Sequence, residues 1–436
     1  MVQPIACATR HTQVLVLGAG PAGASSAAFC AQAGLKTMLL EREKGPRFHV
    51  GESLMPDTYF TLKRLGVLEK LQTSLHTRKY SVQFVTETGK ESQPFYFFEN
   101  NPHECAQTWQ VIRSEFDAML VDNASFHGVE VYQGTHALDV ITDPGNPGKV
   151  IGARVRQQGV GEFDIFADVV VDATGQSALI ANKLNLRVSD PLLRNASIWT
   201  YYKGASREGG LDEGATLILA IQKKKGWFWY IPLANDIVSV GVVGPIDYLL
   251  KGRGGAEAIF NEELERCPGA KQRVEPGQRL GEFFTTKDFS YKSSQVAGDG
   301  WVLVGDAFGF LDPVYSSGVF LALKNGEMAA DAIRSAFQAN DFSGARLGAW
   351  GPLFLRGMDR MKRLVHAFYE GFNFGTFIRK HPDMKRHLID LLIGDLFKDS
   401  VDAIILPLDA MREENRLMQA QEMEMEKTMA SQAIAY

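Results

Sequence analysis

The amino-acid sequence predicts an α/β fold, in which a parallel sheet covered by helices is joined to a second, β-rich layer and to C-terminal helices. The first observation is an apolar run, residues 14–17, followed by a glycine-rich turn and an Ala/Ser-rich helical stretch. Two further apolar runs, 169–171 and 301–304, also lead into a turn with an acidic residue and a glycine. Strands buried on both faces have such continuous apolar sequences. The third observation is the segment 199–244, whose strand-like stretches are typical of a β meander.

The segment 13–41 is the most informative part of the chain. Its first strand leads into Gly18, Gly20 and Gly23, spaced as G-x-G-x-x-G, and its second strand ends at Glu41. Gly18 permits a tight turn, Gly20 lets the backbone approach a pyrophosphate, and Gly23 lets the helix lie close to the strand. The N–H groups at the helix start can bind phosphates, and Glu41 can accept a hydrogen bond from a ribose hydroxyl. The segment therefore predicts a dinucleotide site, and no second G-x-G-x-x-G unit in this context is present.

The order of these patterns predicts a discontinuous nucleotide-binding domain with an inserted layer. The expected parts are a nucleotide-binding domain at 1–190 and 280–345, a β-rich substrate layer at 191–279, and a helical region at 346–436. An Ala/Leu-rich helix is expected at 319–336. Residues 411–436 have few large apolar side chains, so we expect a partner-dependent helix or a frayed tail there.

The composition is that of an ordinary globular protein, with 436 residues, 45% hydrophobic and 22% charged. These fractions exclude a disordered chain, a fibrous repeat and a small disulfide-stapled scaffold. The formal net charge of -5 gives no basic excess for nucleic-acid binding. No window reaches the ~18 apolar residues of a membrane span, and the first residues lack the apolar centre of a signal peptide. The four scattered cysteines lack metal-ligand spacing, so we expect reduced thiols, no metal and a cytoplasmic location.

Three separated pieces of the chain form a recognisable set. They are the segment 13–41, the stretch 111–117 with Arg113, and Gly305-Asp306-Ala307. Together they resemble the FAD-binding segments of the flavoprotein monooxygenase class, in which the residues matching Arg113 and Asp306 contact the flavin nucleotide. The structural alternatives are a surface ion pair for Arg113 and a helix N-cap for Asp306. The resemblance implies a flavoprotein monooxygenase-like fold and FAD-binding roles for Gly18, Gly20, Ala22, Gly23, Glu41, Arg113, Asp306 and Pro313.

Two further motifs resemble those of the flavin-dependent halogenases. Residues 227–232 match W-x-W-x-I-P, and residues 310–318 match F-x-x-P-x-x-S-x-G. Taken singly, the tryptophans are also compatible with the core of a sheet, and a Pro/Ser/Gly turn before a helix is common. In this order behind the FAD segments, the two motifs point to the halogenase family.

The resemblance implies an enzyme that uses FADH2 from a separate flavin reductase, together with oxygen, to oxidise chloride or bromide to hypohalous acid. Backbone at Ser317 and Gly318 would hold the halide, which suits the N–H groups at the start of a helix. Trp227 and Trp229 would separate the flavin from the substrate and so disfavour direct oxygen transfer to it.

The family also uses a lysine that delivers the oxidant, either by a hydrogen bond to hypohalous acid or as a haloamine. A desolvated lysine with a lowered pKa could do either. Lys79, downstream of the stretch 51–54, lies at about the distance found in phenol- and pyrrole-type halogenases and is the candidate. Lys63 is the competitor, but residues 61–70 resemble an amphipathic helix with Lys63 in solvent. An ordinary surface position for Lys79 is the structural alternative.

One position departs from the tryptophan-halogenating branch of the family. That branch carries a glutamate two residues before the position of Ser317, whereas this chain has Tyr315. The departure favours the branch that halogenates electron-rich phenols or pyrroles, which is frequently supplied with substrate tethered to an acyl- or peptidyl-carrier protein.

Three rivals to a halogenase stay open on the sequence. A flavin-dependent aromatic hydroxylase would reduce its flavin with NAD(P)H and would be indifferent to the loss of Lys79. A flavoprotein similar to geranylgeranyl reductase would bind an isoprenoid lipid and ignore halide. A flavoprotein without turnover would bind FAD tightly and act as a binding or scaffold subunit.

Overall fold

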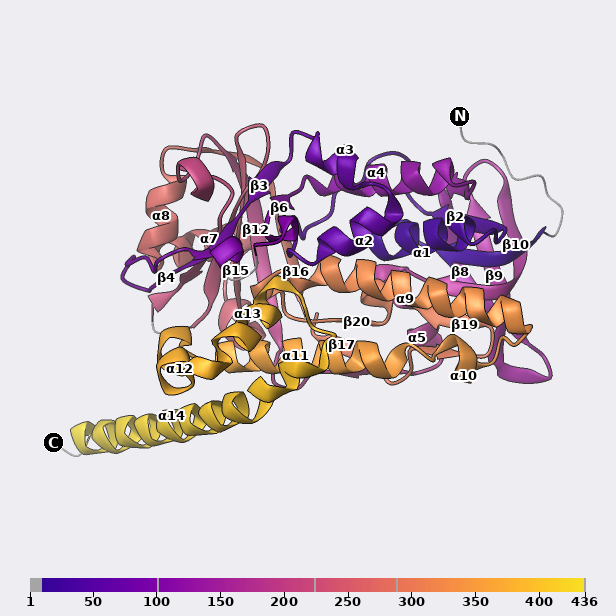
Figure 1. Ribbon diagram of the computed structural model, residues 1–436. Helices are drawn as coiled ribbons and strands as arrows, with labels where there is room; N and C mark the ends of the chain where they lie inside the picture. The colour runs from indigo at the N-terminus through magenta and orange to yellow at the C-terminus, as the bar shows by residue number, and fades with distance from the viewer. Residues whose placement is uncertain (1–9, 100–101, 223–224, 288, 435–436) are drawn as a thin grey trace. The chain divides into compact units, whose positions relative to one another are not determined.

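The computed structural model describes residues 10–434, apart from 100–101, 223–224 and 288 (Figure 1). Contacts divide the chain into two compact units, Met1–Pro352 and Leu353–Tyr436. The first unit contains the β-sheets and the second is helical. The predicted α/β class is therefore confirmed, while the domain boundaries drawn from the sequence stay a prediction.

The larger sheet of the first unit has a parallel centre. Its strand order is β18-β19-β10-β1-β2-β7, and the hairpin β8–β9 extends it beside β10. The strands from β19 to β7 run parallel. Residues 14–17 are fully buried, as their apolar sequence predicts. The bounds are β1 Arg10–Leu17, β2 Thr37–Glu41, β7 Glu130–Gln133, β8 Thr135–Asp143, β9 Asn146–Gln157, β10 Gly161–Asp172, β18 Ala297–Gly298 and β19 Trp301–Leu303.

Helix α1 (Pro21–Gln32) connects β1 to β2 and packs against the long helix α9 (Ser317–Ala339). The helix expected at 319–336 is thus confirmed and is three residues longer at its C-terminal end. The two helices approach closely at Gly326, where an added Cβ atom would lie 2.7 Å from Ser25 Oγ and 2.8 Å from Ala22 O. The middle of α9 thus packs against the first turns of α1.

The second large sheet has seven strands in the order β16-β12-β15-β14-β13-β4-β5. Strands β13, β14 and β15 pair in chain order as the predicted meander, whereas β12 pairs with β15 and β16, so the meander does not include the strand around Trp199. Strands β4 and β5 come from residues 81–96 and join the sheet through a parallel pairing of β4 with β13. The layer therefore draws on chain segments outside 191–279. The bounds are β4 Ser81–Val85, β5 Phe95–Tyr96, β12 Asn195–Lys203, β13 Thr216–Ala220, β14 Trp227–Pro232, β15 Ile237–Pro245 and β16 Gln278–Lys287.

The amphipathic helix expected at 61–70 is instead two short helices, so this prediction is wrong in its bounds. Helix α2 covers Thr58–Leu65 and α3 covers Leu68–Gln72. Gly66 separates them with φ +77°, a left-handed conformation that glycine adopts easily and that ends a helix. Lys63 is exposed on α2, as expected, and its Nζ donates to Tyr59 Oη at 3.3 Å.

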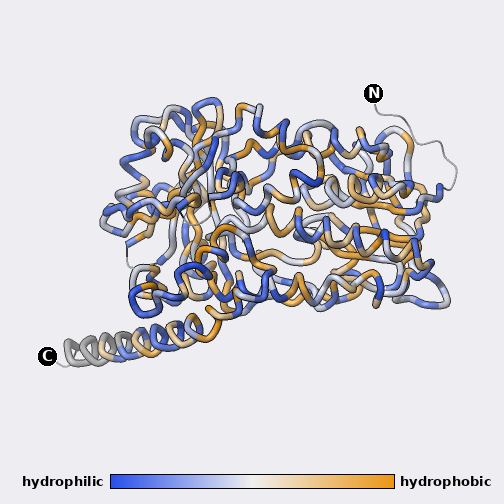
Figure 2. The backbone as a smooth tube through the Cα atoms, viewed as in Figure 1, coloured by the Kyte–Doolittle hydropathy of each residue, from blue (hydrophilic) through white to orange (hydrophobic). Residues whose placement is uncertain are grey.

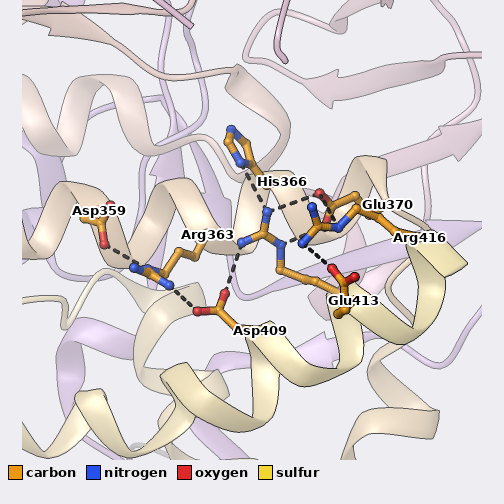
Figure 3. A network of polar contacts seen from close by, with 8 residues as sticks. Asp359, Arg363, His366, Glu370, Asp409, Glu413 and Arg416 are labelled. Carbon is orange, nitrogen blue, oxygen red and sulfur yellow. Dashed lines mark hydrogen bonds and ion pairs between the residues drawn. The ribbon is translucent and has the colours of Figure 1, made fainter. Parts of the chain in front are cut away.

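The second unit consists of helices, among them α11 (Gly351–Tyr369) and α14 (Ile405–Ile434). Charged side chains link these two helices (Figure 3). Arg412 on α14 donates to both carboxylate oxygens of Glu370, at 2.7 and 3.1 Å, and to Asp409 at 3.1 Å. Arg363 on α11 pairs with Asp409 as well. Figure 2 shows α14 as a mixture of hydrophilic and hydrophobic residues. Its buried residues are Leu408, Met411 and Asn415, whereas the described side chains from residue 416 onward are exposed.

The described cysteines are buried thiols without a disulfide, at positions 30, 105 and 267. Burial raises the pKa of Cys30 to about 12 and that of Cys267 to about 11, which makes both poor nucleophiles. Cys7 lies outside the described residues. Within the described part of the chain, no helix combines the length and the apolar character needed to cross a membrane.

Candidate active site

A cavity of about 700 Å³ lies in the first unit, between the carboxyl ends of the parallel strands and the seven-stranded sheet. Ligands of open α/β sheets bind at this end of the strands. The walls include seven of the eight residues that the resemblance assigns to FAD, namely Gly18, Gly20, Ala22, Glu41, Arg113, Asp306 and Pro313. The eighth, Gly23, lies behind the cavity wall, where it lets α1 approach the turn.

The glycine-rich turn leaves no room for side chains. Gly18 has φ +101°, and a Cβ atom there would lie 2.3 Å from Ala173 O. At Gly23 a Cβ atom would lie 1.9 Å from Gly18 O, well inside van der Waals contact. Only glycine therefore fits these two positions. The turn is held with its backbone facing the cavity, as a pyrophosphate requires.

Glu41 ends β2 at the cavity wall and is nearly buried. Its Oε2 accepts a hydrogen bond from Ala19 N at 3.0 Å, and its Oε1 accepts one from Glu43 N at 3.1 Å. Arg47 Nη1 lies 3.5 Å from the same carboxylate. Glu41 thus holds the glycine-rich turn in addition to any ribose contact, because a carboxylate has about four acceptor sites.

Arg113 and Asp306 both line the cavity. Arg113, at the start of α4 (Arg113–Phe126), is buried and bidentate to Asp117 at 2.9 and 3.0 Å, and its Nη1 donates to Val50 O at 2.8 Å. The surface-pair alternative is therefore wrong. Asp306 lies inside the short turn 305–307, and the N-cap of that turn is Val304. Desolvation raises the pKa of Asp306 to about 6, although Arg113 opposes the shift.

An aromatic wall closes the cavity on the side of the seven-stranded sheet. Trp227 and Trp229 on β14 both line it, with ring centroids 6.4 Å apart. Trp229 Nε1 donates to Ser239 Oγ at 3.0 Å, which fixes the indole. Trp199 from β12 adds a third indole, 6.3 Å from that of Trp229, and stacks on Phe284. Sequence reasoning missed Trp199 because a single tryptophan in a strand carries no motif.

The turn before α9 presents backbone to the cavity. Ser316 adopts φ +58° and is the N-cap of α9, which begins at Ser317. Gly318 lines the cavity beside Phe310 and Pro313, while Ser317 is fully buried behind it. No hydrogen-bond partner lies within reach of Ser317 Oγ among the described residues. A helix start with an unpaired buried hydroxyl fits a small anion.

Lys79 ends β3 (Thr77–Lys79), which pairs with β6 (Thr108–Gln110). Its side chain is 2% exposed, so the surface alternative is wrong. Its Nζ lies 2.9 Å from Ser53 Oγ and 3.4 Å from Leu54 O, and 5.4 Å from the centre of the Phe97 ring. Lys79 takes part in none of the ion pairs found among the described residues. Burial without a counter-charge lowers the pKa of Lys79 to about 7.

Several residues of the site carry no sequence signal of their own. Arg47, Ser53, Thr216 and Trp199 line the cavity, and Gln110 lies behind Thr216. Ser53 lies in the stretch 51–54 that drew attention to Lys79, but nothing in the sequence joins it to Thr216. The pairing of β3 with β6, the bridge between Ser53 and Gln110, and the side-chain contact of Ser53 with Thr216 at the start of β13 bring them together.

The cavity fits FAD in both size and lining. It joins a glycine cradle, a carboxylate at the end of β2, and an aromatic wall. A helix start suited to a small anion opens into the same space. These features match the requirements of a dinucleotide and a halide together.

The family model described as tryptophan halogenase matches residues 13–106 and 98–373 of this chain. A 1H-pyrrole-2-carbonyl-[peptidyl-carrier protein] brominase of Pseudoalteromonas luteoviolacea is 33% identical, over 88% of this chain and 92% of the relative. A corresponding chlorinase of Pseudomonas fluorescens is 28% identical, with 92% of each chain covered. The solved structure of the flavin-dependent brominase Bmp2 gives a TM-score of 0.83 at 31% identity, covering 93% of this chain and 99% of that one. The myxobacterial chondrochloren halogenase CndH gives 0.76 at 28%, covering 93% and 97%.

Proposed function

The chain belongs to the tryptophan halogenase family, and we propose that this flavin-dependent halogenase acts on a pyrrole or phenol ring carried by an acyl- or peptidyl-carrier protein. Bound as FADH2, the flavin supplies the reducing equivalents with which oxygen and chloride or bromide give hypohalous acid. A separate flavin reductase is the proposed source of FADH2. The cytoplasmic location expected from the cysteines stays a prediction.

The residues of the cavity divide the work between binding and delivery. The glycine-rich turn, Glu41 and Asp306 bind the nucleotide, and Ser317 with Gly318 offers N–H donors to the halide. Trp227 and Trp229 form a barrier between the flavin and the substrate, so the organic ring does not meet the flavin directly. Hypohalous acid then reaches Lys79, which directs the electrophilic halogen to the ring.

The observation that carries this proposal is the buried Lys79 amine, which hydrogen-bonds to Ser53 and has no carboxylate partner among the described residues. A neutral amine is a nucleophile and a hydrogen-bond donor, whereas an ammonium can only donate. Because burial lowers the pKa of Lys79 to about 7, a large share of the amine is neutral at physiological pH. Such a lysine can activate or capture hypohalous acid, as the family role requires.

The substrate class rests on two supports. The relatives at 33% and 28% identity are, by their names, enzymes of a carrier-bound pyrrole, and each aligns over 92% of its own length. The chain also has buried Tyr315, where the tryptophan-halogenating branch carries a glutamate. A ring that is already electron-rich needs no such carboxylate.

A substrate comparison tests the proposal. The enzyme, a flavin reductase, FAD and bromide or chloride are incubated with pyrrole-2-carbonyl-carrier protein, free pyrrole-2-carboxylate, a carrier-bound phenol and free tryptophan. We expect halogenated product, detected by mass spectrometry, from a carrier-bound ring and at least tenfold less from the free acid. Preferred halogenation of free tryptophan would overturn the substrate assignment.

The Lys79→Met variant tests the assigned role of the lysine. We expect product formation to fall at least 100-fold, while FAD affinity and the release of hypohalous acid into solution stay within about twofold of the parent. Lys63→Met, which alters an exposed lysine on α2, is the matched control and should retain full activity. Full halogenation by Lys79→Met would move the delivery role to another residue.

A further inference from the structure

The Lys79 amine lies beside the wall of the cavity. Ser53 and Thr216 are among the described residues that line the cavity, and Lys79 is not. The Nζ atom has two polar neighbours, Ser53 Oγ and Leu54 O. The carbonyl oxygen can accept a hydrogen bond but has no proton to give, so only the hydroxyl can pass one. Among the described residues, Ser53 is therefore the group that can pass a proton between the amine and the cavity.

Ser53 belongs to a row of buried polar groups that runs away from the lysine. Ser53 Oγ lies 3.0 Å from Thr216 Oγ1, and Gln110 Nε2 lies 2.8 Å from Thr216 Oγ1. Gln110 Nε2 also lies 2.9 Å from Gly214 O. The three side chains are between 0% and 4% exposed, so water does not replace these contacts.

The row has a fixed direction. Gly214 O only accepts, so the amide nitrogen of Gln110, and not its oxygen, must face that carbonyl. The same nitrogen then donates to Thr216 Oγ1, which leaves the Thr216 hydrogen free to be donated to Ser53 Oγ. The Ser53 hydrogen is in turn free for Lys79 Nζ or for a molecule in the cavity. A hydroxyl so placed is a ready proton donor on one side and an acceptor on the other.

The elements that hold this row are rigid. Ser53 forms a β-bridge with Gln110, and Leu54 N donates to Trp109 O at 3.0 Å. Thr216 begins β13, and Gln110 ends β6, whose strand partner is β3 with Lys79. The backbone of four segments thus aligns the donor and acceptor atoms without any charged group.

We propose that Ser53, oriented by Thr216 and Gln110, is the positioning residue through which Lys79 exchanges protons with the cavity. This inference rests on the proposed role of Lys79. When hypohalous acid reacts with the neutral amine, a nitrogen–halogen bond forms and the oxygen–halogen bond breaks. The nitrogen loses one proton to Ser53 Oγ, and Ser53 gives its own proton to the departing oxygen. The products are a haloamine and water, and no atom or electron is left over.

The first test uses the flavin-free protein, so that its outcome is independent of turnover. Protein labelled with ¹⁵N-lysine is studied by NMR near pH 6, and the Lys79 signal is assigned by its loss in Lys79→Met. We expect Ser53→Ala to slow the exchange of the Lys79 amine protons with solvent at least tenfold. Ser53→Thr, which keeps a hydroxyl, should stay within about threefold of the parent. Unchanged exchange in Ser53→Ala would overturn the proposal.

Two further variants separate the hydroxyl row from a general packing effect. Thr216→Val removes the donor to Ser53 and should slow exchange at least threefold, which also covers the case of an unfolded Ser53→Ala. Thr108→Val is the control, because Thr108 is equally buried on β6 and pairs with Lys79, but its hydroxyl bonds to Met55 O. Equal slowing in Thr108→Val and Thr216→Val would refute a specific role for the row.

A second test examines turnover. Ser53→Ala should lower kcat for halogenation at least tenfold with the KM for halide unchanged, and Ser53→Thr should restore most of kcat. A normal kcat for Ser53→Ala would contradict the inference. If Lys79→Met also halogenated normally, the proposed function would fail, whereas the exchange measurements would still decide the route of the proton.

Discussion

The glycine-rich turn and a second region, formed by Lys79, Ser53, Thr216 and Gln110 and called here the Lys79 corner, border the same cavity. The two regions are built in opposite ways. The turn consists of consecutive backbone, and its function depends on the absence of side chains at Gly18 and Gly23. The Lys79 corner depends on side chains from four separate segments, brought together by β3, β6 and β13. A local backbone site tolerates almost no change of residue, whereas a composite site can lose one member and keep its fold.

The two regions also handle charge differently. Around the turn, Glu41, Arg47, Asp117 and Arg113 compensate one another within 3.5 Å. Among the described residues, only neutral groups surround the Lys79 amine, so burial acts without opposition and lowers the pKa of the lysine to about 7. The first arrangement suits the tight binding of a charged nucleotide. The second keeps a base available at neutral pH.

The largest expected effect tests the steric half of this comparison. Gly23→Ala places a Cβ atom 1.9 Å from Gly18 O, a backbone atom that cannot move aside. We expect a loss of about 3 kcal/mol or more in stability, together with loss of FAD binding. Urea denaturation and fluorescence titration with FAD measure the two effects. Gly209→Ala is the control, because the space around Gly209 is open and its φ is -100°, and normal FAD binding by Gly23→Ala would contradict the close packing.

A smaller effect is expected at Glu41. Glu41→Ala removes a buried acceptor of Ala19 N and, by our proposal, of a ribose hydroxyl, so FAD affinity should fall by about 1–3 kcal/mol. Isothermal titration of the variant with FAD and FMN distinguishes the two contributions, because FMN lacks the adenosine ribose and should lose less. Glu43→Ala, at an exposed neighbour, should bind FAD normally. Equal losses for FAD and FMN would assign Glu41 to holding the turn alone.

The most gradual effect tests the electrostatic half of the comparison. Between pH 7 and 10.5 the unfolded state binds more protons at Lys79 than the folded state, because burial lowers the pKa of the folded lysine to about 7. Stability contributed by this group therefore rises with pH across that window, by at most about 1.4 kcal/mol per pH unit. Urea denaturation at pH 7, 8 and 9 should show the parent gaining stability relative to Lys79→Met. A constant difference between the two proteins would show that the lysine is not desolvated.

The elements with a local cause could be predicted from the sequence. The strands at 14–17 and 169–172, the helix at 319–336 and the meander strands β13, β14 and β15 all appear where their patterns place them. The prediction of one helix over 61–70 was wrong because Gly66 adopts a left-handed conformation that ends the helix. A single glycine in a helical pattern does not reveal that conformation. The sequence also did not predict that β4 joins the seven-stranded sheet, because strands that pair across a long sequence separation leave no local pattern.

The sequence by itself determined the nucleotide-binding segment and the membership of the family. Steric exclusion at Gly23 acts against Gly18 O within the same turn and is recorded in the motif, whereas a side chain at Gly18 is excluded by Ala173 O from a distant segment. Tertiary structure alone decided that Arg47 faces Glu41 and that Trp199 joins the aromatic wall. It also decided that Ser53, Thr216 and Gln110 form one hydrogen-bonded row that begins at Lys79. The physical reason is that desolvation and hydrogen-bond direction depend on every segment that surrounds a group. A local sequence pattern contains information only about the segment in which that group lies.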